Sequence, residues 1–234
     1  MEVKTAIISG DAAELRRLLS SSPAQANALV SWGPNCRILT HPLHFVSDML
    51  FNGVLTKGKE LPLIDALLEA GAEVDFLKEG KDETPLIGAA SLGAEEVGVR
   101  LLEAGAQPHL RGEGGETALH WAALFGELQL AQRLIEGADL ELEDAQYHST
   151  PLGWAVHSVC DPPMENPANH GHQRKVAALL VARGATVRRQ RPGDCAGLRR
   201  IIPALLPVTR RAPKPKKLVL PAVNIPKRLI GKTI

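Results

Sequence analysis

The sequence predicts an all-α protein built from stacked helix-turn-helix units, and two observations support this prediction. The threonines that open three similar segments stand at positions 84, 117 and 150, so each step is 33 residues. Each segment also pairs an alanine-rich stretch with a leucine-rich stretch that closes at a glycine. A fixed period of that size is typical of repeats that stack on one another.

The clearest copy of the repeat covers residues 116–138. Thr117 precedes the first expected helix, where its hydroxyl can cap the first turn. Ala122 and Ala123 are small enough to let this helix lie close to its neighbours, and Gly126 permits a tight turn. The second expected helix has apolar residues at helical spacing and ends where a glycine takes a left-handed conformation. Four units have such a glycine: Gly71, Gly105, Gly137 and Gly184.

The Thr-Pro-Leu-His core, the Leu-Leu-x-x-Gly-Ala ending and the 33-residue period resemble ankyrin repeats. Four copies cover roughly residues 36–187, and a degenerate copy precedes them. The resemblance implies a solenoid with short β-turn fingers that binds partners on its concave side. We therefore expect an ankyrin repeat domain over residues 1–187 and a basic, proline-rich tail over 188–234, partly docked or extended. The five units are expected near residues 3–35, 36–78, 79–111, 112–144 and 145–187.

Three units depart from the pattern. The first ends in serines and a proline at 20–23, which suits an N-terminal cap with one solvated face. The second holds an apolar insert at 49–55, for which we expect a longer first helix or a folded-back segment. That insert either covers the flank of the repeats or forms a family-specific partner site. The insert of the fifth unit, residues 160–172, is rich in Pro and Asn and is predicted to be an irregular loop.

Composition favours a soluble, cytoplasmic monomer. Aromatic residues make up 3% of the chain, so we expect aliphatic packing. No run of about 18 apolar residues occurs and residues 1–4 do not resemble a signal peptide, so no membrane partner is expected. Three cysteines without a C-x-x-C pair fit a reducing compartment: Cys36, Cys160 and Cys195.

Charge is distributed unevenly along the chain. Residues 188–234 carry 13 Lys or Arg and one acid, a net charge of +12, whereas residues 1–187 carry 14 basic and 25 acidic residues, a net charge of −11. Basic clusters attract phosphate, so nucleic-acid association through the tail is one alternative. The tail contains no Phe, Trp or Tyr for base stacking, which favours docking on the acidic repeats or on an acidic partner instead.

One group of side chains in the fifth unit has metal-binding potential. His157 and Cys160 are three residues apart, and His170 and His172 follow in the insert. Imidazole and thiolate suit zinc, but this spacing matches no standard zinc module. A metal-dependent protein is therefore kept as an alternative, while the main prediction assigns no metal, no cofactor and no catalytic residue. A Cys160 nucleophile paired with His157 has no identifiable orienting group.

By resemblance, partner contacts come from the turn tips and from first-helix positions that do not pack between repeats. Apolar side chains at Leu92, Leu124 and Phe125 predict an exposed patch, unless the N-terminal insert or the tail covers it. Beside acidic tips, such a patch would suit a partner with an apolar anchor and basic surroundings. The candidate contact residues are Lys81, Glu83, Ser91, Leu92, Glu113, Glu116, Leu124, Phe125, Tyr147, His157 and Ser158.

The histidines and tryptophans of the first helices are interpreted as structural. His44 and His120 occupy the place where the family's histidine forms hydrogen bonds near the turn. Trp121 and Trp154 occupy equivalent positions in adjacent units and are expected to fill the core.

Overall fold

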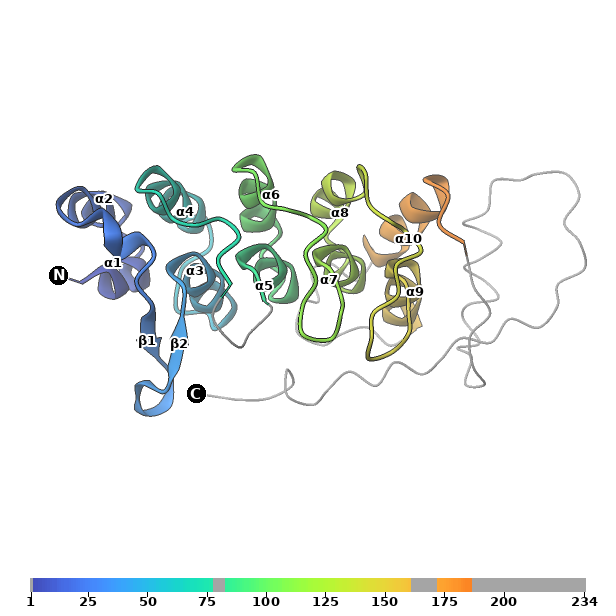
Figure 1. Ribbon diagram of the computed structural model, residues 1–234, viewed down its shortest axis with the longest axis horizontal. Helices are drawn as coiled ribbons and strands as arrows, with labels where there is room; N and C mark the ends of the chain where they lie inside the picture. The colour runs from blue at the N-terminus through green and yellow to red at the C-terminus, as the bar shows by residue number, and fades with distance from the viewer. Residues whose placement is uncertain (1, 78–82, 161–171, 187–234) are drawn as a thin grey trace, which may run out of the picture. The chain divides into compact units, whose positions relative to one another are not determined.

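A computed structural model describes residues 2–77, 83–160 and 172–186, and these form two compact units that meet in sequence at Glu113 and Gly114. The division falls next to the predicted boundary between the third and fourth repeats. Figure 1 labels the helices and strands of each unit. Among the described residues, no helix is both long enough and apolar enough to cross a membrane.

The N-terminal unit contains three helix pairs and a short hairpin. Its first helices are α1 (Val3–Ser9), α3 (Pro42–Phe51) and α5 (Pro85–Ser91), and its second helices are α2 (Ala12–Ser21), α4 (Glu60–Glu69) and α6 (Glu95–Glu103). First helices pack on first helices and second helices on second helices, so the two sets form two rows (Figure 1). Short 3-10 turns lie at Pro23–Ala26 and Pro34–Cys36.

The unit beginning at Gly114 repeats the same arrangement with two helix pairs. It contains α7 (Ala118–Phe125), α8 (Leu128–Leu134), α9 (Pro151–Cys160) and α10 (His172–Ala182). Helix α7 packs on α9, and α8 packs on α10. The predicted all-α class of stacked two-helix repeats is therefore confirmed.

The first helices α5, α7 and α9 each begin at a capping threonine, as the repeat pattern predicts, whereas no side chain caps α1. The Thr84 hydroxyl accepts a hydrogen bond from the amide of Ile87 at 3.2 Å, and Thr117 forms a capping box with His120. Thr150 accepts one from the amide of Gly153 at 3.2 Å. The glycines after the second helices all have positive φ, from 80° to 100°.

The N-terminal hairpin consists of β1 (Val30–Trp32) and β2 (Ile38–Thr40). The strands are antiparallel, with Trp32 opposite Ile38 and Val30 opposite Thr40. This is the structured form of the short finger that the family resemblance implies.

The apolar insert at 49–55 extends the first helix and then folds back. Helix α3 has 10 residues, against 7 in α5 and 8 in α7, which confirms the longer helix; α9, whose unit also carries an insert, has 10 as well. Beyond it, the amide of Leu55 donates to the carbonyl of Met49 at 2.9 Å, and the Leu55 side chain is buried. Phe51 and Val54 remain exposed.

The core is mainly aliphatic, with tryptophans buried in the second unit. Trp121 and Trp154 are 8% and 4% exposed, and their rings meet edge to face at 5.0 Å. The prediction that they fill the core is confirmed. Their indoles replace the leucines that a purely aliphatic core would use at these positions.

Candidate protein-binding pocket

The β1–β2 hairpin is held firmly against the N-terminal unit. The Trp32 ring packs against the fully buried Phe45 ring of α3, with centroids 5.9 Å apart. The Lys4 ammonium of α1 donates a hydrogen bond to the carbonyl of Ser31 at 2.7 Å. Two helices therefore fix the hairpin, and the surface beside it is preorganised.

His41 takes the place of a capping threonine at the start of α3. Its Nδ1 accepts a hydrogen bond from the amide of Leu43 at 3.3 Å, and its Nε2 donates to Asn27 at 3.0 Å. The ring stacks on Phe76 with centroids 4.4 Å apart. Burial, and the nearby positive charge of His44 when protonated, lower the pKa of His41 to about 4. His41 is therefore neutral at pH 7.

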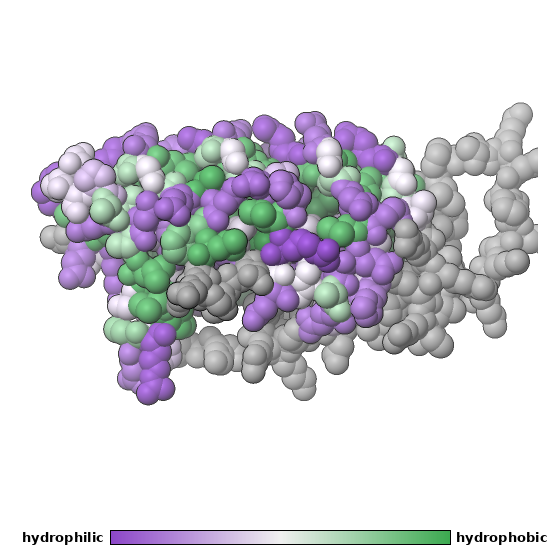
Figure 2. All heavy atoms as spheres, in the orientation of Figure 1, coloured by the Kyte–Doolittle hydropathy of each residue, from purple (hydrophilic) through white to green (hydrophobic). Residues whose placement is uncertain are grey.

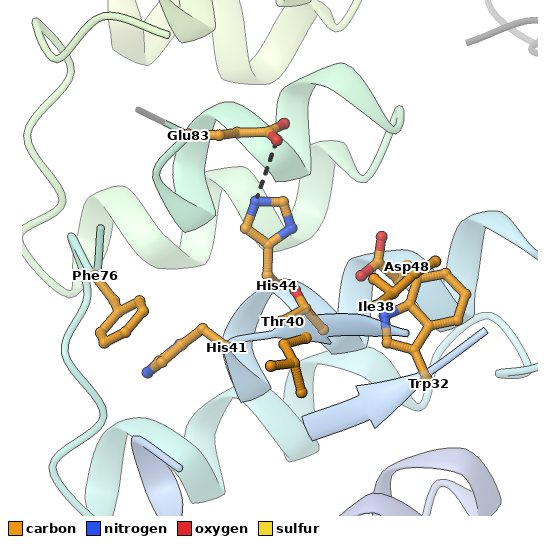
Figure 3. Close-up of a pocket in the computed structure, with 9 residues that line it drawn as sticks. Trp32, Ile38, Thr40, His41, His44, Asp48, Phe76 and Glu83 are labelled. Carbon is orange, nitrogen blue, oxygen red and sulfur yellow. Dashed lines mark ion pairs between the residues drawn. The ribbon is translucent and has the colours of Figure 1, made fainter. Parts of the chain in front are cut away.

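His44 lies in the pocket and does not form the capping hydrogen bonds expected of it. Its Nδ1 has no hydrogen-bond partner among the described residues, and its Nε2 lies 4.0 Å from the Glu83 carboxylate (Figure 3). The ring lies so close to Gly88 of α5 that a Cβ there would fall 2.0 Å from His44 Cε1. The missing side chain of Gly88 thus makes room for the imidazole. Of the two histidines interpreted as structural, His120 alone forms the predicted bonds.

A pocket of about 140 Å³ opens between the hairpin, α3 and the residue that precedes the cap of α5. Ile38 and Leu39, on its hairpin side, are 41% and 44% exposed and adjacent in the strand, so together they form an exposed apolar patch. Figure 2 shows hydrophobic residues gathered at the base of the hairpin and hydrophilic ones at its tip. The pocket is lined by Trp32, Ile38, Leu39, Thr40, His41, His44, Asp48, Phe76 and Glu83.

Two of the predicted contact residues meet beside this pocket. The Ser91 hydroxyl at the end of α5 lies 3.3 Å from Glu83, to which it donates a hydrogen bond. Ser91 itself is buried, at 7% exposure, so the contact places Glu83 against the end of α5. Leu92 is half-buried and Glu113 is exposed, whereas Lys81 lies outside the described residues.

In the second unit the expected apolar patch is not exposed. Leu124 is 1% exposed and Phe125 is 9% exposed, so the prediction of an open surface at these positions is wrong. Phe125 stacks on the buried Trp121 ring, with centroids 6.1 Å apart. Leu124 and Phe125 therefore belong to the core. Phe125 is buried because Trp121, one helical turn earlier, provides a ring on which it packs.

The remaining predicted contact residues of the second unit differ in exposure. Ser158 is buried, and its hydroxyl donates to the carbonyl of Ala155. Glu116, Tyr147 and His157 are half-buried. Burial, reinforced by the negative charges of Asp144 and Glu116, raises the pKa of Tyr147.

Asp144 is an important residue that the sequence analysis missed. Its carboxylate is 1% exposed and accepts hydrogen bonds from the amides of Gln146, Tyr147 and Ser149. It also accepts one from the Trp154 indole at 3.1 Å. The sequence feature that could have identified it is its place six residues before the capping Thr150, where an aspartate can accept hydrogen bonds from the backbone amides of a turn.

The hairpin side of the pocket was also missed. Residues 33–37, which begin Gly33-Pro34-Asn35, separate Val30-Ser31-Trp32 from Ile38-Leu39-Thr40, and such turn residues between β-forming triplets are typical of a hairpin. The pattern therefore contained the signal for the strands. It contained none for the approach of His44 to Gly88, which depends on packing between two repeats.

The metal-binding alternative is only partly within the described residues. His157 is in α9 and His172 begins α10, whereas His170 and the side chain of Cys160 are outside the described part. Within that part, no three His, Cys, Asp or Glu side chains are grouped for a metal ion. The basic tail at 188–234 also lies outside the described residues.

Comparison with known proteins identifies the repeat. Residues 53–144 match the family model described as ankyrin repeats (3 copies). The chain is 34% identical to ankyrin repeat and SOCS box protein 16 of Homo sapiens, over 81% of this chain and 47% of that protein. It is 39% identical to an ankyrin repeat-containing protein of Treponema pallidum (strain Nichols), over 33% of this chain and 26% of that protein.

A third match is to the 2-5A-dependent ribonuclease of Homo sapiens. Here the identity is 36%, over 32% of this chain and 10% of that protein. The chain thus spans less than half the length of each of these three relatives.

Proposed function

This chain is an ankyrin repeat protein, and from that premise we propose that it is a non-catalytic module that binds a partner protein through its turn tips and first helices. Ankyrin repeats are generally protein-interaction modules. The observation that most supports this role is the open pocket at the hairpin, where exposed aliphatic side chains lie next to carboxylates on a preorganised surface.

Rigidity is what makes such a surface suitable for binding. Trp32 and Lys4 fix the hairpin, and Gly88 allows His44 to pack against α5. A surface that is already ordered loses little conformational entropy when a partner binds. The same reasoning extends to the tips and first helices of the second unit, where Glu116, Tyr147 and His157 are half-buried.

Site-specific photo-crosslinking tests this proposal. A photoreactive amino acid is placed at Glu83, Leu92 or Glu116, and for comparison at Gln132 or Glu103, which are exposed on the second helices. We expect protein adducts from the first set in extracts of the native source and few from the second. Equal crosslinking from both sets would refute binding through the tips and first helices.

A further inference from the structure

The aliphatic side chains at the hairpin are not explained by the protein's own packing. Ile38 and Leu39 are 41% and 44% exposed, and both border the same pocket. Covering an exposed aliphatic side chain is favourable in proportion to the area removed from water. A binding partner is therefore expected to place an apolar group here.

The other end of the pocket is acidic. Glu83 and Asp48 contribute carboxylates, and the Glu83 side chain is 41% exposed. No Lys or Arg is found among the described residues that line the pocket. Figure 3 shows Glu83 above the His44 ring and Asp48 to its right, so a basic group reaching toward the imidazole meets acidic side chains.

We propose that this pocket binds an extended segment of a partner protein that carries an aliphatic side chain within two residues of an Arg or Lys. The aliphatic group rests on Ile38 and Leu39, and the cation pairs with Glu83. This inference rests on the proposed protein-binding function and specifies the chemistry of the partner. A purely polar segment would leave the aliphatic side chains uncovered, and an acidic segment would be repelled by the carboxylates.

Selection from a random peptide library displayed on phage, against the full-length chain, tests the proposal. Enriched sequences are expected to combine an aliphatic residue with a neighbouring Arg or Lys. Binding of the corresponding synthetic peptides is then measured by fluorescence anisotropy. We expect Ile38→Glu and Glu83→Lys each to weaken binding by about tenfold or more, because each removes one of the two contacts.

Matched variants control for general changes in surface and charge. Phe51→Glu places a charge at another exposed apolar residue, and Glu96→Lys reverses another exposed acid. Both are expected to bind the peptides within twofold of the unchanged chain. Circular dichroism confirms that each variant is folded, and Glu83→Lys is expected to regain affinity for a peptide whose basic residue is replaced by Glu.

Four results would overturn the inference, and three of them come from the selection and the binding measurements. They are a failure to enrich any peptide, enrichment of peptides without the aliphatic and basic pair, and unchanged binding to Ile38→Glu and Glu83→Lys. If the two variants bind the peptides unchanged, the chain still binds protein segments. The proposed function then stands, and only the assignment of the binding site to this pocket is wrong. If a synthetic peptide of residues 210–228 displaces the selected peptides, the occupant is the chain's own segment and the partner proposal is also wrong.

Discussion

The carboxylate of Glu141 accepts two hydrogen bonds from Thr186, one from its backbone amide and one from its hydroxyl, each at 2.6 Å. In the N-terminal unit the carboxylate of Asp75 likewise accepts from the backbone amide of Gln107 at 3.0 Å. Each acid stands four residues after a helix-ending glycine, and each amide stands two residues after the next such glycine within the same unit. The repeats are therefore joined by a recurring bond as well as by helix packing.

Replacing Asp75 by Ala is expected to lower the free energy of unfolding by about 1 kcal/mol, the usual contribution of a hydrogen bond to stability. The amide and side-chain nitrogens of Gln107 both lose their acceptor, although water can replace it in part. Urea denaturation followed by circular dichroism measures the change. Glu73→Ala is the control, because Glu73 is an exposed acid on the same loop whose backbone amide, not its carboxylate, bonds to Asn27. A loss as large in the control would contradict the assignment.

Removing the Asp144 carboxylate should have a larger effect. Asp144→Ala leaves three backbone amides and the Trp154 indole without their acceptor in a buried place, so we expect a loss of about 2–4 kcal/mol. Glu136→Ala, at an exposed acid of the same unit, should change stability by less than about 0.5 kcal/mol. Equal denaturation midpoints for the two variants would show that the turn does not depend on this carboxylate.

The parts of the fold that were predictable from sequence depend on local chemistry. Thr84 and Thr117 cap helices through atoms three residues away, and the helix-ending glycines adopt the conformation that their position requires. Such features repeat with the sequence period, so one copy explains the others. The length of α3 was also predictable, because the apolar insert is contiguous in sequence.

The pocket was less predictable, because it depends on contacts between residues distant in sequence. His44 fits only because residue 88 is a glycine, and Glu83 approaches it from the following repeat. The burial of Phe125 was not predictable from sequence for a similar reason. Its position in the repeat indicated exposure, but the ring of Trp121 provided a buried surface on which it stacks.

The buried His41 makes the stability of the protein depend on pH. Its pKa is about 4 in the folded protein and about 6.5 when unfolded, so the folded state disfavours the protonated form. The stabilising effect is complete above pH 6.5 and is lost as the pH falls toward 4. From the pKa difference, the free energy of unfolding should be about 2 kcal/mol lower at pH 5 than at pH 7 because of His41.

Urea denaturation at pH 7 and pH 5 measures this loss, and a His41→Asn variant isolates the contribution of the imidazole from other titrating groups. Asparagine can cap α3 but does not titrate. Between pH 7 and pH 5 the free energy of unfolding of the variant should therefore fall by about 2 kcal/mol less than that of the unchanged chain. Parallel losses in both proteins would show that His41 does not carry the pH dependence.

A pair of glycines in the second unit separates backbone strain from crowding. Gly126 and Gly137 have similar φ values of 74° and 80°, so alanine at either position is strained by about 1 kcal/mol. A Cβ on Gly126 would also lie 2.7 Å from the backbone nitrogen of Gln173 at the start of α10, whereas one on Gly137 would meet no atom within 4 Å. We therefore expect Gly137→Ala to lose about 1 kcal/mol and Gly126→Ala to lose at least about 2 kcal/mol, since α10 must shift. Hydrogen exchange should show faster opening of the α10 amides in Gly126→Ala alone, and equal losses of stability in the two variants would mean that the close approach of α10 to Gly126 carries no energetic cost.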